Sequence, residues 1–109
     1  MKIHQWEVWK GRPPGFEKDH WFVILSGQER CDNANLRLVN GLACYSLRGQ
    51  LDDKIEVRLD AADGFAAATV CPCDFVFPLE KSKLHSTQGF VSWERQQQIK
   101  SKLKQVLRL

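Results

Sequence analysis

Short hydrophobic segments alternate with turn-forming stretches along most of the chain. Residues 5–10 alternate between apolar and polar side chains, which predicts a half-buried strand. Residues 20–26 form a continuous run rich in aromatic and β-branched side chains, as in a strand buried on both faces. Further strands are predicted at residues 36–47 with a bend at Gly41, at residues 55–59, and at residues 67–79 with a break at Pro72. This spacing favours a sheet protein.

The last segment has a helical period instead. Ile99, Leu103, Val106 and Leu107 recur at the spacing of one helix face, and Ser92 is a suitable N-cap. We therefore expect a mainly β fold with one C-terminal helix. The simplest assembly is a small barrel, of which the helix covers an open end or face.

Composition limits the classes of protein that need to be considered. The 109 residues fit a single domain over residues 1–109, with an ordinary 43% of hydrophobic and 27% of charged residues. The net charge of +3 is a mild bias, which supports nucleic-acid binding only if it is concentrated on one face. No apolar run has the length that targeting or a membrane span requires, so we expect a cytoplasmic protein with free thiols.

The order of the segments resembles the MazF/PemK (Kid) family of bacterial toxins, which have an SH3-like small β-barrel, a fold shared with the CcdB toxins. Residues 6–9 are similar to the opening strand of that family, and residues 20–26 to its second strand. Residues 39–48 resemble the third strand, which ends in a hydroxyl-bearing residue, and residues 89–109 resemble the closing strand-to-helix segment. The likeness extends over almost the whole chain.

The resemblance implies the toxin of a type II toxin–antitoxin system. Such a protein is a homodimer that binds a cognate antitoxin and cleaves single-stranded RNA without a metal or other cofactor. The family's chemistry uses an arginine at the start of the second strand and a Thr or Ser late in the third. In this chain the hydroxyl position falls on Ser46, the arginine position on Trp21, and the proline that follows the arginine on Phe22.

RNA cleavage through the 2′-hydroxyl needs a proton acceptor, a proton donor and a group that stabilises charge on the phosphorus centre. We expect His20, Ser46 and Arg48 to be catalytic, because an imidazole titrates near neutrality and Ser46 and Arg48 share one strand face at a spacing of two. Arg12, Lys18 and Trp21 are the predicted RNA-binding residues, and the first two are further cations for the missing arginine.

Each of these residues also has a structural interpretation. His20 can be a hydrogen-bonded residue at the start of a buried strand, Ser46 a satisfied strand hydroxyl, and Arg48 a solvated turn residue. Trp21 opens an apolar run and is favoured as a packing residue. The cations of the C-terminal helix are ordinarily a solvated face, although they can contact phosphates.

The cysteines raise a metal hypothesis that their spacing does not favour. Zinc sites use pairs separated by two to four residues, whereas Cys71 and Cys73 are separated only by Pro72, and Cys44 is the nearest further candidate. We expect buried or interface thiols and no metal site.

Two alternatives to the nuclease remain. The chain can be a binding protein on the same barrel, like the CcdB toxins that poison DNA gyrase without cutting it, or a diverged barrel without activity. Convergence of His20, Ser46 and Arg48 with Lys18 or Arg12 in one pocket favours the nuclease. A pocket filled by Trp21, with the imidazole turned into the core, favours binding.

Overall fold

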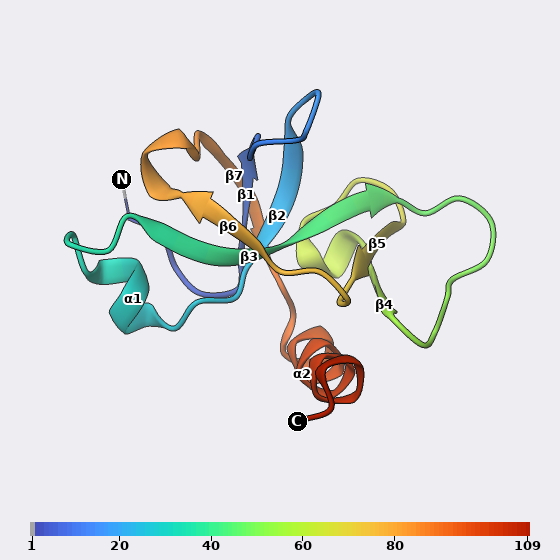
Figure 1. Cartoon of the computed structure of the whole chain (residues 1–109). Helices are drawn as coiled ribbons and strands as arrows, with labels where there is room; N and C mark the ends of the chain where they lie inside the picture. The colour runs from blue at the N-terminus through green and yellow to red at the C-terminus, as the bar shows by residue number, and fades with distance from the viewer. Residues whose placement is uncertain (1) are drawn as a thin grey trace.

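The structure is a computed structural model in which residues 2–109 are described, and it is mainly β with a C-terminal helix, as predicted (Figure 1). The α-helices are α1 (Gln28–Asp32) and α2 (Trp93–Leu107), and short 3₁₀ turns occur at η1 (Ala61–Asp63) and η2 (Lys81–Lys83). The strands are β1 (Glu7–Gly11), β2 (His20–Ile24), β3 (Leu38–Ser46), β4 (Glu56–Leu59), β5 (Thr69–Pro72), β6 (Phe77–Glu80) and β7 (Ser86–Phe90).

The strands form one antiparallel sheet in the order β4-β5-β3-β2-β1-β7. β3 is its longest strand and runs across the middle of the view in Figure 1. Its first half pairs with β6, from Leu38 opposite Glu80 to Gly41 opposite Phe77, and its end pairs with β5. β4 and β7 are the two ends of this order, so the sheet is open, and Figure 1 shows it curled into a half-barrel.

Three predicted segments differ from the structure. Residues 67–79 are two strands separated at residues 73–76 rather than one strand broken at Pro72, because β5 and β6 pair with opposite ends of β3. The polar stretch after residue 26 contains the short helix α1, so α2 is not the only helix. β7 was not among the strands predicted from the hydrophobic pattern, because its mostly exposed residues are ordered by pairing with β1.

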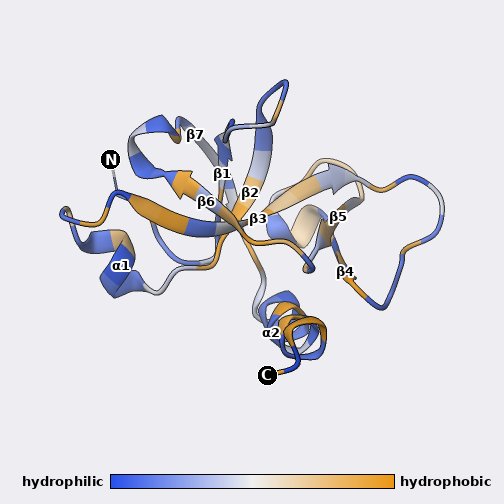
Figure 2. Cartoon of the chain, viewed as in Figure 1, coloured by the Kyte–Doolittle hydropathy of each residue, from blue (hydrophilic) through white to orange (hydrophobic). Residues whose placement is uncertain are grey.

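Hydrophobic side chains pack on both faces of the sheet. One face buries Val8, Val23 and Leu42 together with Ile99 of α2, and the other buries Trp9, Phe22 and Leu79 among others. Figure 2 shows apolar residues along β3 and β6 and alternating apolar and polar residues along α2. Toward the end of the helix the apolar stripe is less covered, since Leu107 is 49% exposed. Among residues 2–109, no helix has the length and apolar character needed to cross a membrane.

A buried carboxylate joins η1, β7 and the start of α2. The fully buried Asp63 accepts hydrogen bonds from the backbone N–H of Asp60 (3.0 Å) and of Ser92 (2.8 Å). At this junction the backbone of Gly64 approaches Gly89 so closely that a Cβ on Gly64 would lie 2.7 Å from the Gly89 Cα. The contact fixes η1 against β7 and thereby places two walls of the cavity described below.

Candidate active site

A cavity of about 620 Å³ lies at the end of the β2–β3 ladder. The start of β2, the end of β3, the loop before β5, and β7 all contribute to it. Five of the six predicted site residues line it, namely Lys18, His20, Trp21, Ser46 and Arg48. The cavity therefore gathers a hydroxyl, an imidazole and cations from segments that are distant in sequence.

Ser46 is the last residue of β3, and its side chain is exposed at the cavity. The residue opposite it on β5 is Thr69, whose hydroxyl also lies at the cavity but donates a hydrogen bond to the Ala67 carbonyl (3.0 Å). Thr69 is buried as well. Ser46 is consequently the more available of these two hydroxyls for a bound phosphate.

His20 opens β2, opposite Gly11 of β1, and its ring lies between two aromatic side chains. The ring centroids of Phe16 and Tyr45 are 5.0 and 5.2 Å away, both in edge-on arrangements. His20 lies two residues before the core residue Phe22, so their side chains share one face of the sheet. Trp21 pairs with Cys44, so Trp21, Cys44 and Ser46 share the opposite face. His20 is half-buried and lines the cavity, so it is not turned into the core.

Trp21 is half-buried against the core on the Ser46 side of the sheet, and part of it lines the cavity. Its cross-strand partner on β1 is Lys10, whose Nζ lies 4.8 Å from the ring centroid of Trp21. Aromatic rings attract cations over their faces. A cation thus lies next to the tryptophan that occupies the predicted arginine position, and the sequence pattern did not indicate it.

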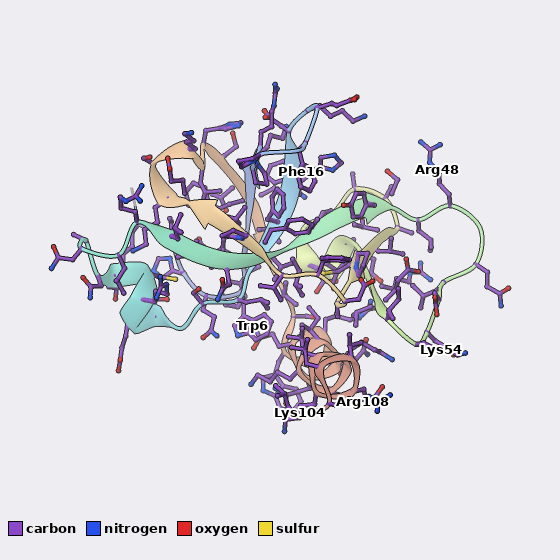
Figure 3. All side chains as sticks on the ribbon, viewed as in Figure 1. Trp6, Phe16, Arg48, Lys54, Lys104 and Arg108 are labelled. Carbon is purple, nitrogen blue, oxygen red and sulfur yellow. The ribbon has the colours of Figure 1, made fainter. Side chains whose placement is uncertain are left out.

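The two predicted arginines have different environments. Arg48 lies two residues beyond the end of β3, so it does not share a strand face with Ser46 as predicted. Figure 3 shows its side chain projecting from the loop after β3, and it takes part in none of the ion pairs within residues 2–109. Arg12 lies outside this cavity, and its Nε donates to Asp19 Oδ1 (3.1 Å).

Asp19 contacts an arginine and a histidine side chain at the edge of the cavity. Besides Arg12, the His85 Nε2 lies 3.1 Å from Asp19 Oδ2. Partial burial opposes ionisation of Asp19, but the hydrogen bonds and charges of Arg12 and His85 outweigh it and lower the carboxyl pKa. This cluster ties the β1–β2 loop to the segment before β7, and His85 was not among the predicted residues.

Further residues at the cavity were not predicted from sequence. Burial raises the pKa of the Tyr45 phenol, so the group stays protonated and can donate a hydrogen bond at neutral pH. Gln88 is the extra residue where the pairing of β1 with β7 shifts register, and it also lines the cavity. Within residues 2–109, no group of three or more His, Cys, Asp or Glu side chains is arranged to hold a metal ion.

Sequence comparisons found no match, either to a family model or to a curated protein. Structural comparison did find similar proteins. An endoribonuclease in complex with its cognate antitoxin, from a mycobacterial species, has a TM-score of 0.80 at 16% identity, over 98% of this chain and 94% of that one. The Mycobacterium tuberculosis toxin MazF-mt6 has a TM-score of 0.78 at 17% identity, covering 94% and 97% of the two chains.

MazF from Deinococcus radiodurans has a TM-score of 0.74 at 20% identity, covering 97% of this chain and 96% of that one. The chain has the fold of the MazF toxins. The predicted fold is therefore confirmed over nearly the full length, with the sheet curled into a half-barrel and α2 against it. In this MazF-like fold the cavity lies where the ends of β2 and β3 meet the η1–β5 loop.

Proposed function

We propose that this chain is a MazF-type endoribonuclease, the toxin of a type II toxin–antitoxin system, which cleaves single-stranded RNA without a metal. The observation that carries this proposal is the single cavity in which His20, Ser46, Lys18 and Arg48 meet. The fold supports it, because similar structures include endoribonucleases and a complex with a cognate antitoxin. We also propose a cytoplasmic location.

In the proposed reaction, the 2′-oxygen of a ribose attacks the adjacent phosphorus while the bond to the 5′-oxygen breaks. His20 accepts the 2′-hydroxyl proton, and the protonated Tyr45 phenol donates to the leaving 5′-oxygen. Ser46 donates a hydrogen bond to a phosphate oxygen, and Arg48 and Lys18 offset the negative charge that develops. The products are a 2′,3′-cyclic phosphate and a 5′-hydroxyl. Trp21 is placed to stack on a neighbouring base.

The proposed partners are a second copy of the chain and a cognate antitoxin. A surface suited to such contacts surrounds Phe75, which is 68% exposed and stacks on Phe77, beside the partly exposed Val76 and Tyr45. Exposed apolar patches of this kind mark protein interfaces. Arg12 and Lys18, in the loop between β1 and β2, provide cationic groups close to the cavity for an acidic antitoxin segment.

Cleavage of a long single-stranded RNA by the purified protein in EDTA tests the proposal. We expect cleavage by the wild type, loss of it in Ser46→Ala and His20→Ala, and no change in Ser101→Ala, a matched serine on the exposed side of α2. Cleavage that persists unchanged in both site variants would refute the site. Cleavage that EDTA abolishes would refute the metal-free mechanism.

A binding protein without nuclease activity is the second candidate, and Trp21 is the observation that favours it. A tryptophan at the predicted arginine position lines the cavity with part of an aromatic side chain rather than with a charge. If the cavity only binds RNA, Trp21→Ala weakens binding by about 1–3 kcal/mol, whereas Trp21→Phe retains most of it. RNA binding by the wild type with no cleavage of any RNA would favour this candidate over the nuclease.

A further inference from the structure

Three of the four cysteines lie together beneath the candidate active site. Cys44 of β3, Cys71 of β5 and Cys73 belong to the buried cluster on the Ser46 side of the sheet, whereas Cys31 packs on the other side. All four are free thiols. The proposed RNA chemistry uses none of them, so their grouping needs a separate explanation.

Cys44 and Cys71 oppose each other across the β3–β5 ladder. Tyr45 pairs with Val70 and Ser46 with Thr69, so the next pair along this register is Cys44 with Cys71. The Leu47 N–H donates to the Ala68 carbonyl, so Leu47 and Ala68 form a hydrogen-bonded pair. Hydrogen-bonded and non-hydrogen-bonded pairs alternate along an antiparallel ladder, and Cys44 with Cys71, three positions away, is therefore a non-hydrogen-bonded pair. The Cα atoms of such pairs lie about 4.5 Å apart, within the range of about 4.4–6.8 Å that a disulfide accepts.

The alternative pairing of Cys71 with Cys73 is less favourable. Along a strand, residues two apart are separated by about 6.6–6.8 Å between Cα atoms, which is the upper limit for a disulfide. Pro72 lies between these two cysteines and restricts the backbone adjustment that would bring them closer. Cys44 is therefore the better partner for Cys71.

The two opposed thiols differ in their access to solvent. Cys44 lines the cavity and is 5% exposed, whereas Cys71 is completely buried. A hydrogen bond with the Cys44 thiol, together with burial, raises the pKa of Cys71 well above its ordinary value. A small oxidant in the cavity thus meets Cys44 first. The raised pKa of Cys71 lowers the fraction of its thiolate, so we expect its attack on oxidised Cys44 to be the slower of the two steps.

We propose that Cys44 is a peroxide-sensitive modification site and that Cys71 resolves the oxidised form as a reversible disulfide. In the first step the Cys44 sulfur displaces one oxygen of hydrogen peroxide, which gives a sulfenic acid and water. In the second step the Cys71 sulfur attacks the Cys44 sulfur, the S–O bond breaks, and the Cys71 proton leaves with the hydroxide as water. The two thiols lose two electrons to the peroxide, and a dithiol reductant reverses the change.

The crosslink would join β3 to β5 at the floor of the cavity, two residues before Ser46. We expect it to fix the spacing of the two strands there and to lower RNA cleavage reversibly. This consequence rests on the proposed nuclease function. Formation of the crosslink does not, so the two are measured separately.

Peptide mapping of the folded, peroxide-treated protein tests the crosslink. Trypsin places Cys44 in residues 38–48 and both Cys71 and Cys73 in residues 59–81. We expect a crosslink between these two peptides, a mass loss of about 2 Da, titration of two thiols instead of four, and full reversal by dithiothreitol. Oxidation of Cys44 to a sulfinic acid without a crosslink, or survival of all thiols in folded protein, would overturn the proposal.

Single variants identify the partner thiol. Cys44→Ala and Cys71→Ala should each abolish the crosslink, whereas Cys73→Ala and the matched control Cys31→Ala should retain it. A crosslink that persists in Cys71→Ala would overturn the assignment. If a core variant does not fold, the wild-type peptide map together with Cys73→Ala still decides the pairing. Cleavage assays on the oxidised wild type, with and without dithiothreitol, then measure the effect on function.

Discussion

The two faces of the β2–β3 ladder make different contributions to the same cavity. On one face Trp21, Cys44 and Ser46 continue the core that α2 covers. On the other face, His20 and Tyr45 belong to a partly exposed group of aromatic rings. The first face offers a hydroxyl and a buried sulfur cluster, and the second offers the groups that can move a proton.

Polar groups from opposite faces meet because both strands end at the cavity. In the middle of a sheet, alternation keeps such groups about one sheet thickness apart. At the rim the sheet ends, so His20 at the start of β2 and Ser46 at the end of β3 line one space. We infer that His20 and Tyr45, on the aromatic face, transfer protons. Ser46, on the core face that α2 covers, and the cations of the adjacent loops stabilise charge.

Removal of His20 is expected to have the largest effect on cleavage. Loss of a general base typically lowers kcat by about 10²–10⁴-fold, so His20→Ala should approach this range in single-turnover cleavage of a defined RNA. His4→Ala, at an exposed histidine near the N-terminus, is the control. A His20→Ala variant that cleaves at the wild-type rate would reduce the aromatic face to a packing role.

Removal of the Ser46 hydroxyl should have a somewhat smaller effect. A lost donor to a developing negative charge lowers kcat by about 10²–10³-fold, and Ser46→Thr should recover much of the rate because it restores the hydroxyl. Single-turnover rates and RNA affinity for both variants check this. If Ser46→Ala weakens binding but leaves kcat unchanged, the core face holds substrate and takes no part in the reaction.

Removal of the Asp63 carboxylate tests the junction of η1, β7 and α2, which places the cavity wall on the face of Trp21 and Ser46. Asp63→Ala leaves the N–H groups of Asp60 and Ser92 without their acceptor, which should lower the free energy of unfolding by about 1–3 kcal/mol. Urea denaturation measures the change, with Asp74→Ala as a control at an exposed carboxylate. Equal stability of the two variants would show that this junction does not hold the wall.

The smallest effect is expected at Asp19, beside the aromatic face. Its pKa is lowered in the folded protein, so its stabilising contribution is present above the ordinary value of 3.8 and is lost as the pH falls through the lower folded-state value. The stability difference between wild type and Asp19→Asn should therefore be small near neutrality and vanish in acid. A difference that grows toward low pH, in urea denaturation at several pH values, would contradict the Arg12–Asp19–His85 cluster.

Periodicity predicted the parts of the fold that depend on local burial. β1 and β4 were located by alternation, β2 and β3 by apolar runs, and α2 by its helical period, and the end of β3 brought Ser46 to the predicted place. β7 and the division between β5 and β6 could not be predicted, because pairing with β1 and β3 defines them. The helix α1 was missed because its five residues are too few to show a period.

The site was predictable only where one segment carried the signal. His20, Trp21 and Lys18 are near neighbours in sequence, so one segment indicated all three. His85, by contrast, meets Asp19 across 66 residues of sequence, and Lys10 reaches Trp21 only through the β1–β2 register. The opposition of Cys44 and Cys71 likewise depends on the register of β3 with β5, which no local pattern encodes.

We propose that this cavity cleaves RNA through the 2′-hydroxyl without a metal. The most direct test is to map the product ends of a single-stranded RNA treated with wild-type protein in EDTA, beside the same RNA with a 2′-deoxy residue at the cleaved position. We expect a cyclic phosphate and a 5′-hydroxyl from the RNA and no cut at the deoxy position. Cleavage at the deoxy position, or products with a 5′-phosphate, would contradict it.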